Sequence, residues 1–424
     1  MRLFLPFSLL IMFFGCSDGD STPASPVLDA PTGLDVRDIS NFGNGQDMEL
    51  GFEPPGDLSL VSEFRIYVVK AENATSFDSL AAAGISNNYT AVEASENYIK
   101  VLLIATSKDV DGDLILEGQA YQLFVSSVGT ENNGSPLSSA SASIMLEQRS
   151  AVRTITGVIQ AGSGGMDMDA NGNIYMGDFG STLDAGGKNV YKITPEGEVA
   201  IFNSAMNGAS GNDFDKDGNL YQSSTVGFMS KITPEGVSST FASGFSGGLI
   251  GVSVQDDGRL YTCNCGGNLI NEVSADGVIS TYVASPLFNC PNGIDVDAEG
   301  NLYVANFGNG DVVKVTPAKE VSVFATVPGG NNGHLLIHGD FIYVVARRGN
   351  AIYQVDFEGK VSKFAGSGSR GTANGNLSQA TFSLPNDIAI SADGRKMYIN
   401  DVAGSSLDER IISPVVIREI DVIE

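Results

Sequence analysis

Histidine is the side chain best suited to proton transfer near neutral pH, and this chain of 424 residues contains two. His334 follows Asn331, Asn332 and Gly333, and is the one candidate for a near-neutral base. The sequence offers no Ser-His-Asp arrangement that would support nucleophilic hydrolysis. His334 is therefore either a weak catalytic candidate, together with Asp401, or an ordinary loop residue.

Cysteine could supply either metal ligands or a disulfide. Three of the four cysteines, Cys263, Cys265 and Cys290, lie far from the N-terminus. Together they lack the fourth ligand and the spacing of a known zinc site. We favour a structural disulfide, which leaves one thiol free because three cysteines form at most one bridge within the chain.

The acidic stretch at residues 109–113 is the third candidate for chemistry, since Asp109, Asp111, Gly112 and Asp113 suggest a calcium loop. In a register that places Gly112 at the sixth position, the first carboxylate and the final bidentate Glu are both missing. We interpret this stretch as an acidic turn, with calcium binding as the alternative.

The N-terminal residues indicate where these groups work. Residues 3–14 are apolar but too few to cross a bilayer as a helix, which is typical of a signal peptide over residues 1–15. Cys16 follows Gly15 in a pattern that resembles the bacterial lipobox, which implies lipidation of Cys16. Residues 16–30 then form a polar, Pro-containing tether. We expect an extracytoplasmic, lipid-anchored protein in an oxidising compartment; a plain secretory signal is the alternative.

Charge excludes one class of partner. Lys and Arg total 24 against 50 Asp and Glu, a formal charge of −26, which repels nucleic acid and anionic lipid. We therefore expect no nucleic-acid partner and membrane contact only through the anchor. With 51 Gly, no Trp and few charged residues, the composition favours many short strands and tight turns, so the predicted fold class is all-β.

Residues 31–148 alternate apolar and polar positions in short runs, which predicts a small sandwich. The predicted strands cover residues 48–52, 64–69, 98–104, 121–128 and 140–146. The order of residues 31–36, 49–55, 64–69 and 121–125 resembles a fibronectin type III domain. Phe52 stands where that family has a core Trp, and Tyr121 matches its conserved Tyr. The resemblance implies a spacer or adhesion module.

Residues 151–424 contain six copies of one unit, in which an apolar strand leads through an acidic Gly turn into an aromatic strand. The turn glycines lie 39 to 55 residues apart, the size of one four-stranded propeller blade. They are Gly172, Gly218, Gly258, Gly300, Gly339 and Gly394. Six copies predict a six-bladed β-propeller.

The last copy ends at its third strand, while residues 154–161 resemble the fourth strands of the other copies. We therefore predict that residues 154–161 pair with residues 415–422. This closes the ring and removes exposed sheet edges.

Residues 290–296 with 303–308, and residues 364–390, resemble the NHL repeat, and the pattern is shared with SMP-30/gluconolactonase propellers. Those lactonases hold one divalent cation at a mouth of the central channel with a Glu, an Asn and an Asp. Asn292 matches their Asn, Asp387 or Asn386 partly matches their Asp, and Ser163 replaces their Glu. The resemblance implies a weaker site for calcium or a similar ion, with Asp178 and Asp401 as substitute ligands.

Counting from each turn Gly predicts which residues reach this mouth. The residues eight positions before the turn glycine are Gly164, Ser210, Ile250, Asn292 and Asn386, and the corresponding residue of the fifth copy is Asn332. The strand ends add Asp178, Asn264, Asn306 and Asp401, and Arg347 follows in the fifth copy. Each Asx could instead fix a loop by bonding to backbone N–H groups. The same placement brings Cys265 beside Cys290, and this bridge would join the third and fourth blades.

Two functions follow. The first is an anchored propeller that binds a protein, glycan or small molecule at the channel mouth. The second is a metal-dependent hydrolase of the lactonase or esterase type, with Asn292, Asn386, Asp387, Asp178 and Asp401 around the ion. The missing Glu favours the first.

Overall fold

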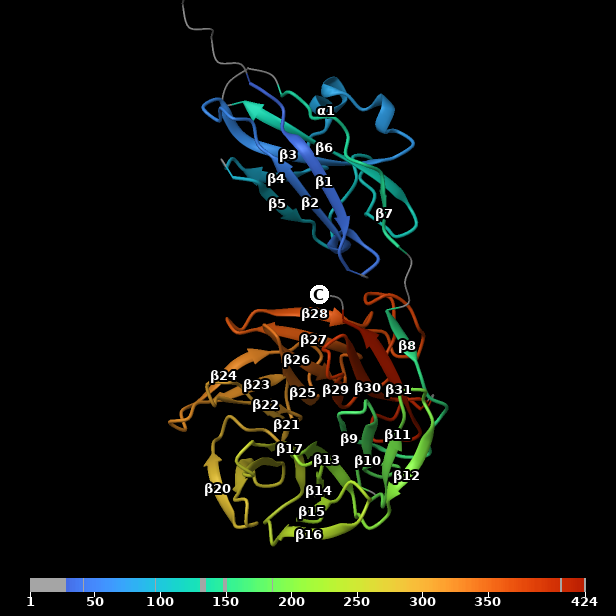
Figure 1. Ribbon diagram of the computed structural model, residues 1–424, viewed down its shortest axis with the longest axis vertical. Helices are drawn as coiled ribbons and strands as arrows, with labels where there is room; N and C mark the ends of the chain where they lie inside the picture. The colour runs from blue at the N-terminus through green and yellow to red at the C-terminus, as the bar shows by residue number, and fades with distance from the viewer. Residues whose placement is uncertain are drawn as a thin grey trace, which may run out of the picture.

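A computed structural model of the protein describes residues 28–40, 42–95, 97–129, 135–147, 151–184, 186–404 and 406–422. The predicted signal peptide, Cys16 and nearly all of the tether at 16–30 lie outside the described residues. Figure 1 shows two bodies, a smaller one formed by the N-terminal strands and a ring formed by the rest. Within the described ranges, no helix is long and apolar enough to cross a membrane.

The smaller body consists of two antiparallel sheets around one core. The first sheet has the order β1 (Thr32–Asp38), β2 (Met48–Glu53), β5 (Ile99–Leu102), and the second has the order β4 (Thr90–Glu93), β3 (Val61–Lys70), β6 (Ala120–Gly129), β7 (Ile144–Met145). Helix α1 (Ser79–Gly84) and two 3-10 turns, Gly45–Asp47 and Ala74–Ser76, join these strands. Both sheets turn alternate apolar side chains inward, as a sandwich requires.

Aromatic residues occupy the centre of this sandwich. The fully buried rings of Phe52 and Phe64 meet edge to face with centroids 5.4 Å apart. Phe52, which the sequence resemblance places in the core, therefore contacts the opposite sheet. The hydroxyl of Tyr121 accepts a hydrogen bond from the Leu116 N–H at 3.2 Å. This bond ties the loop before β6 to the strand itself.

The strand expected over residues 140–146 was predicted too long, since only Ile144–Met145 is a strand. Serine side chains replace part of the backbone ladder before it. The N–H groups of Val125 and Leu123 donate to the Oγ atoms of Ser138 and Ser141, each at 2.9 Å. Hydroxyl groups thus accept the bonds that carbonyl groups accept in a regular strand pair.

The ring consists of six four-stranded antiparallel sheets, the architecture of a β-propeller (Figure 1). The first three blades are β9 (Ser163–Met168), β10 (Ile174–Asp178), β11 (Val190–Ile193), β12 (Val199–Asn203); β13 (Ala209–Phe214), β14 (Leu220–Ser224), β15 (Phe228–Ile232), β16 (Ser238–Ser243); and β17 (Leu249–Val254), β18 (Leu260–Asn264), β19 (Leu269–Val273), β20 (Ile279–Ala284). The fourth and fifth blades are β21 (Pro291–Val296), β22 (Leu302–Asn306), β23 (Asp311–Val315), β24 (Val321–Thr326); and β25 (Asn332–His338), β26 (Phe341–Ala346), β27 (Ala351–Asp356), β28 (Val361–Ala365). The sixth is β29 (Ile388–Ile390), β30 (Lys396–Val402), β31 (Val415–Asp421) and β8 (Val152–Thr154).

The repeated acidic turn explains why each blade begins with a hairpin. In the first blade, Asp169 Oδ1 accepts from the N–H groups of Asn171 and Asn173, both at 2.9 Å. Gly172 has a φ of +82°, a conformation that glycine adopts without steric cost. The turn thus fixes the first strand against the second through one carboxylate and one glycine.

An aromatic pair holds the outer strand of five blades against the second strand. Tyr175 meets Phe202 edge to face with ring centroids 4.8 Å apart. The equivalent pairs are Tyr221 with Phe241, Tyr261 with Tyr282, Tyr303 with Phe324, and Tyr343 with Phe364. The aromatic strand after each turn therefore supplies the packing within the blade.

The sixth blade takes its outer strand from the start of the ring. β31 pairs antiparallel with β8, with Arg418 opposite Thr154 and Ile420 opposite Val152. An isolated bridge between Ile159 and Val415 extends the contact. The predicted partner segment 154–161 thus pairs with β31 only in part. Continuous pairing covers Val152–Thr154, and within 154–161 it is interrupted before the bridge at Ile159.

A buried arginine secures the long connection between β28 and β29. Arg418 of β31 is fully buried and donates to the carbonyl groups of Thr381 and Ala373 at 2.8 and 3.0 Å. Its guanidinium lies 3.4 Å from the carboxylate of Asp401, which is also fully buried. The sandwich contacts the same connection, because Ser378 Oγ donates to the Phe42 carbonyl.

Candidate functional site

The innermost strand of each blade places one residue at the channel axis. In each blade the aromatic residue of the second strand pairs with a residue of the innermost strand, as Tyr303 pairs with Asp295. The axial residue lies two positions before that innermost-strand partner, as Gly293 does in the fourth blade. The six equivalent positions are Gly165, Gly211, Gly251, Gly293, His334 and Asp387. A Cβ atom added to Gly293 would lie only 2.5 Å from the Cα of His334. At this position four blades have glycine, packed against the backbone of the next blade, and the fifth and sixth blades carry the side chains of His334 and Asp387.

These two side chains contact each other across neighbouring blades. Nδ1 of His334 lies 3.2 Å from Oδ2 of Asp387. Asp387 also accepts from the N–H groups of Met166 and Ile388, each at 2.6 Å. Burial lowers the pKa of His334 to about 4, so its ring is neutral at pH 7. Burial also raises the pKa of Asp387.

A cavity of about 180 Å³ opens beside this pair at one end of the channel. Each blade contributes at least one residue to its wall, which contains Ser163, Phe179, Leu183, Ser210, Ile250, Cys265, Cys290, Asn292, Phe307, His334, Arg347, Asn386 and Ile412. Apolar side chains and a few polar groups are the usual composition of a small-molecule site. Since Nδ1 of His334 faces Asp387, Nε2 is the ring nitrogen left for a group in the cavity.

Arg347 gives the cavity a positive charge. Its side chain is buried, and its guanidinium donates to the backbone carbonyl of Glu409 at 3.3 Å. The carboxylate of Glu409 is instead bound by the neighbouring Arg348, whose Nη2 lies 2.6 Å from Oε2. Burial lowers the pKa of Arg347 to about 10, so the group remains a cation at neutral pH. Across the described part of the chain, no carboxylate forms an ion pair with Arg347.

Ser163 supplies an uncommitted hydroxyl. Its side chain is 3% exposed and lines the cavity, yet its Oγ atom has no hydrogen-bond partner in the structure. A buried hydroxyl without a partner costs free energy, so this group is available to a ligand.

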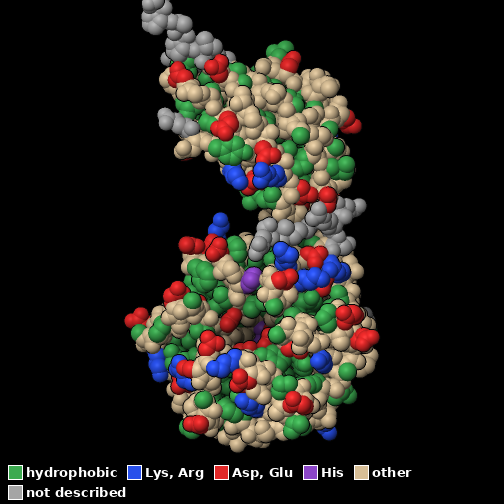
Figure 2. Space-filling model, in the orientation of Figure 1, with side chains coloured by type: hydrophobic (Ala, Val, Ile, Leu, Met, Phe, Trp, Pro, Cys, Tyr) green, Lys and Arg blue, Asp and Glu red, His purple; other side chains and the backbone are tan. Residues whose placement is uncertain are grey.

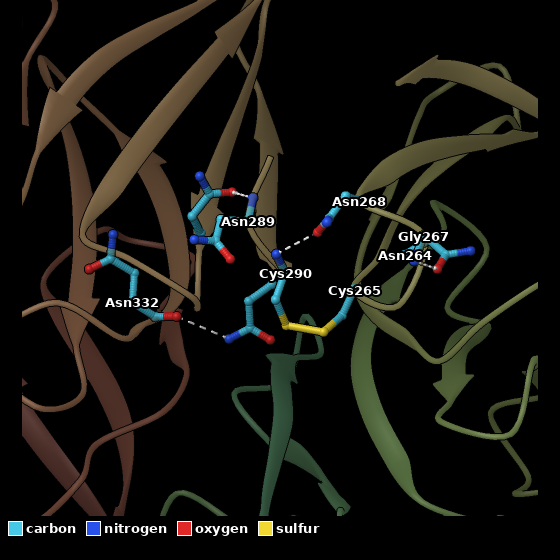
Figure 3. The surroundings of a disulfide bond; sticks show 9 residues. Asn264, Cys265, Gly267, Asn268, Asn289, Cys290 and Asn332 are labelled. Carbon is cyan, nitrogen blue, oxygen red and sulfur yellow. Dashed lines mark hydrogen bonds between the residues drawn. A yellow bond between two sulfur atoms is a disulfide. The ribbon is translucent and has the colours of Figure 1, made fainter. Parts of the chain in front are cut away.

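The disulfide between Cys265 and Cys290 forms one wall of the cavity (Figure 3). Cys265 follows β18 and Cys290 precedes β21, so the bridge joins the third and fourth blades as the sequence led us to expect. The Cys290 N–H donates to Asn268 Oδ1 at 2.8 Å, a second link between the two loops. Cys263 is the free, buried thiol, and burial raises its pKa.

The five residues expected around a metal ion do not converge. Only Asn292 and Asn386 line the cavity, and their Nδ2 atoms donate to backbone carbonyl groups of neighbouring blades. Asp178 Oδ1 accepts from the N–H groups of Gly162 and Gly180, so it fixes a loop. Asp401 accepts from Ser383 and faces Arg418, while Asp387 is held by two N–H groups and His334. Three of the five expected ligands thus accept backbone N–H groups, which leaves a poor donor set for a divalent cation, and the metal site stays a prediction of the sequence resemblance.

The asparagines expected at the mouth form hydrogen bonds that fix loops, which is the alternative role that the sequence left open. Asn264 accepts from the Gly267 N–H at 2.9 Å, as Figure 3 shows. Asn306 accepts from Asn289 and donates to the Leu287 carbonyl, and Asn332 donates to the Asp311 carbonyl. Among the expected mouth residues, Arg347 does line the cavity.

Sequence reasoning missed the apolar wall and a set of buried carboxylates. Leu183 and Ile412 lie in loops without a repeat signal, whereas Phe179 and Phe307 each stand four residues after the blade Tyr and directly before a Gly, a recurrence that could have identified them. At the ladder position that pairs with the aromatic residue, the inner strands carry Asp167, Asp213 and Asp295. Each accepts an N–H from the next blade, as Asp213 does from Val254 at 2.6 Å. The recurrence of Asp two residues after an axial Gly was the available signal.

These carboxylates lie near a second hollow of the ring. Burial raises the pKa of Asp295 to about 6, and burial together with Asp167 raises that of Asp213. A polar hollow of about 430 Å³ is lined by Asp213, Asp256, Asp257, Arg259 and Asp295 among others. Figure 2 shows that the ring is hollowed at its centre, with acidic side chains beside the opening.

The acidic turn at residues 109–113 already holds a cation of the protein itself. Suitable oxygen atoms of Asp109, Asp111 and Asp113 lie within 4.8 Å of one another. The ammonium group of Lys70 lies 3.2, 3.0 and 2.7 Å from these three carboxylates. Lys70 therefore balances part of the negative charge of the turn and contacts all three carboxylates that a metal ion would use.

Comparison with known proteins supports the propeller. Residues 288–314 match the model of the NHL repeat family. This segment includes one of the two stretches on which the sequence resemblance rests, and it contains Cys290 and Asn292 of the cavity wall. No curated protein matches the sequence.

Solved structures share the fold at low sequence identity. An auxiliary nutrient binding protein from Bacteroides thetaiotaomicron is 13% identical, with a TM-score of 0.54 over 93% of this chain and 98% of that one. A protein of unknown function from the same organism is 14% identical, with a TM-score of 0.53 over 93% and 100%. A gluconolactonase from Xanthomonas campestris is 14% identical, with a TM-score of 0.51 over 65% and 90%. At these identities the likeness concerns the fold.

Proposed function

We propose that the protein binds a small molecule, or the terminal residue of a glycan, in the cavity at the mouth of its propeller. The observation that carries this proposal is the cavity wall, in which Ser163 Oγ is buried without a hydrogen-bond partner and the buried Arg347 forms no ion pair with a carboxylate of the described residues. A bound ligand would supply those partners. The volume of about 180 Å³ lies below that of typical drug-sized pockets, which favours one compact group over a flat protein surface.

We place this binding protein outside the cytoplasm, attached to a membrane through a lipid on Cys16. The sequence of the first sixteen residues is the basis for the anchor. The Cys265–Cys290 disulfide agrees with an oxidising compartment, where such bonds persist.

In this proposal the sandwich is a fibronectin type III-like spacer between the tether and the propeller. Its sheets of three and four strands and the Tyr121 bond to Leu116 support that assignment. The auxiliary nutrient binding protein shares the fold over nearly the whole length of both chains, which agrees with a binding role for the pair of domains.

Metal-dependent hydrolysis is the second function that the sequence suggested, and the gluconolactonase likeness concerns the same fold. It needs oxygen ligands that meet at one point. Because Asp178, Asp387 and Asp401 are committed to backbone N–H groups, we favour binding.

A thermal-shift screen of the mature protein against monosaccharides, oligosaccharides and small organic acids tests the proposal. A true ligand at one hundred times its Kd stabilises the folded state by about 2.7 kcal/mol. Ser210→Phe, which fills the cavity, should abolish the shift, and Val226→Phe on an exposed loop should retain it. Metal analysis and a lactone and ester screen with and without chelator run in parallel. Chelator-sensitive turnover would replace the binding proposal with the hydrolase.

A further inference from the structure

We infer that the ligand of the mouth cavity carries a single carboxylate group, as an acidic sugar does, and that Arg347 binds this carboxylate. The inference rests on the proposed binding function and specifies its ligand class. Three features support it: the state of the Arg347 guanidinium, the geometry and charge of the anion that would match it, and the polar and apolar groups of the remaining wall.

The first feature is the state of the Arg347 guanidinium. It has five N–H donors, and the structure gives it one hydrogen bond, from Nη2 to the Glu409 carbonyl. The nearest acidic side chain, that of Glu409, is taken by Nε and Nη2 of Arg348 at 2.8 and 2.6 Å. Arg347 is only 3% exposed and lines the cavity, so a group bound in the cavity can reach its remaining N–H donors. A buried cation of this kind calls for an anion from outside the chain.

The second feature is the geometry and charge of that anion. A planar guanidinium matches the two oxygen atoms of a carboxylate with parallel hydrogen bonds. One cation balances one negative charge, whereas a phosphate dianion would keep an excess negative charge. The formal charge of −26 opposes such an excess.

The third feature is the rest of the wall, which suits a polyhydroxylated ring. The Nδ2 atoms of Asn292 and Asn386 donate to backbone carbonyl groups, so their Oδ1 atoms are left to accept from hydroxyl groups. Ser163 Oγ has no partner and can donate or accept. Phe307, whose ring centroid lies 5.8 Å from the Arg347 guanidinium carbon, offers a flat apolar face.

Isothermal titration calorimetry of the mature protein with matched sugars tests this inference. The probes are D-glucuronate and D-galacturonate, each compared with glucose or galactose, which carry CH₂OH in place of the carboxylate, and with inorganic phosphate. We expect a uronate to bind at least about tenfold more tightly than its neutral partner. Arg347→Gln should remove this preference and leave weak binding of the neutral sugar. Arg259→Gln, which removes a cation at the other hollow, should retain it.

Arg347→Lys keeps the charge and loses the forked geometry, so it should weaken uronate binding while the protein stays folded. This second variant keeps the test decisive if Arg347→Gln does not fold. Equal affinity for a uronate and its neutral sugar, tighter binding of phosphate, or a uronate preference that survives Arg347→Lys unchanged would overturn the inference. If the protein binds neutral sugars without a uronate preference, the inference fails and the proposed binding function stands. If no compound in the thermal-shift screen stabilises the protein, the proposed function fails as well.

Discussion

Nδ1 of His334 and Oδ2 of Asp387 lie 3.2 Å apart at the channel axis, in positions where the other four blades have glycine. A Cβ atom at any of these four glycines would lie 2.2 to 2.5 Å from the backbone of the next blade, so the close packing of the inner strands excludes a side chain there. The contact between His334 and Asp387 fixes the histidine ring beside the cavity. The centre of the ring is therefore asymmetric, although its blades repeat.

The first prediction concerns pH. The pKa of His334 is about 4 in the folded protein and near 6.5 in an unfolded chain. Between these values the unfolded state binds the extra proton, so this residue makes the protein less stable as the pH falls from 6.5 to 4. The loss reaches about 3 kcal/mol at pH 4. Urea unfolding of His334→Gln across this range should lack that contribution.

Asp387 contributes with the opposite sign, because its raised pKa favours the folded state at low pH. The difference between wild type and His334→Gln isolates the histidine. Ser163→Ala changes the same cavity without removing a titrating group, so its stability curve should run parallel to that of wild type. Parallel curves for wild type and His334→Gln would contradict the prediction.

The second prediction concerns the disulfide. Cys265 and Cys290 are separated by 25 residues along the chain. A crosslink that closes a loop of this size stabilises a protein by about 3 kcal/mol in the chain-entropy model. The Cys265→Ser/Cys290→Ser double variant should lose this amount and become insensitive to reducing agent. Thermal melts with and without dithiothreitol measure both effects, and Cys263→Ala should keep the sensitivity of wild type.

The third prediction concerns the buried pair in the sixth blade. Arg418→Met should cost about 3 to 5 kcal/mol, because it leaves Asp401 buried without its cation and removes the bonds to Thr381 and Ala373. The double variant Arg418→Met/Asp401→Asn should recover part of that loss. Denaturant unfolding of the two single variants and the double variant gives the coupling energy. Additive single effects would show that the two charges act independently.

The fourth prediction concerns ring closure. Val152 is fully buried in β8 and exchanges two backbone hydrogen bonds with Gly375. Val152→Asp should destabilise the protein by about 4 kcal/mol, because a carboxylate would lie in an apolar core. Val158→Asp is the matched control, since Val158 is 56% exposed in the same segment. Rapid trypsin cleavage of the first variant and resistance of the second is the expected result; equal resistance counts against a role for β8 in closure.

The ring could be predicted from the sequence because one local device repeats. An Asp that caps the turn and a Gly at positive φ, as at Asp169 and Gly172, specify a hairpin without long-range information. The repeat length then gives the blade. The lipid anchor and the signal peptide lie outside the described residues and stay predictions.

Site residues were harder to predict where a blade departs from the repeat. In the fifth blade the turn Gly339 follows Leu336, the partner of Tyr343, by three positions, whereas Gly300 follows Asp295, the partner of Tyr303, by five, so a count from the turn glycine arrives at Asn332 instead of His334. In the first blade the same count gives Gly164, whereas the cavity is lined by Ser163. The choice between a ligand role and a loop role for Asp178 depends on backbone N–H groups, which sequence spacing does not reveal.

The pairing of β8 with β31 joins residues more than 260 positions apart, so the last blade is completed by the two ends of the domain. Such contacts form slowly, because most of the chain must be ordered before the strands can meet. A chain that crosses a membrane from its N-terminus would deliver β8 long before β31. β8 would then remain an unpaired sheet edge until β31 had crossed the membrane. The duration of translocation would therefore determine how long the unclosed ring could form incorrect contacts.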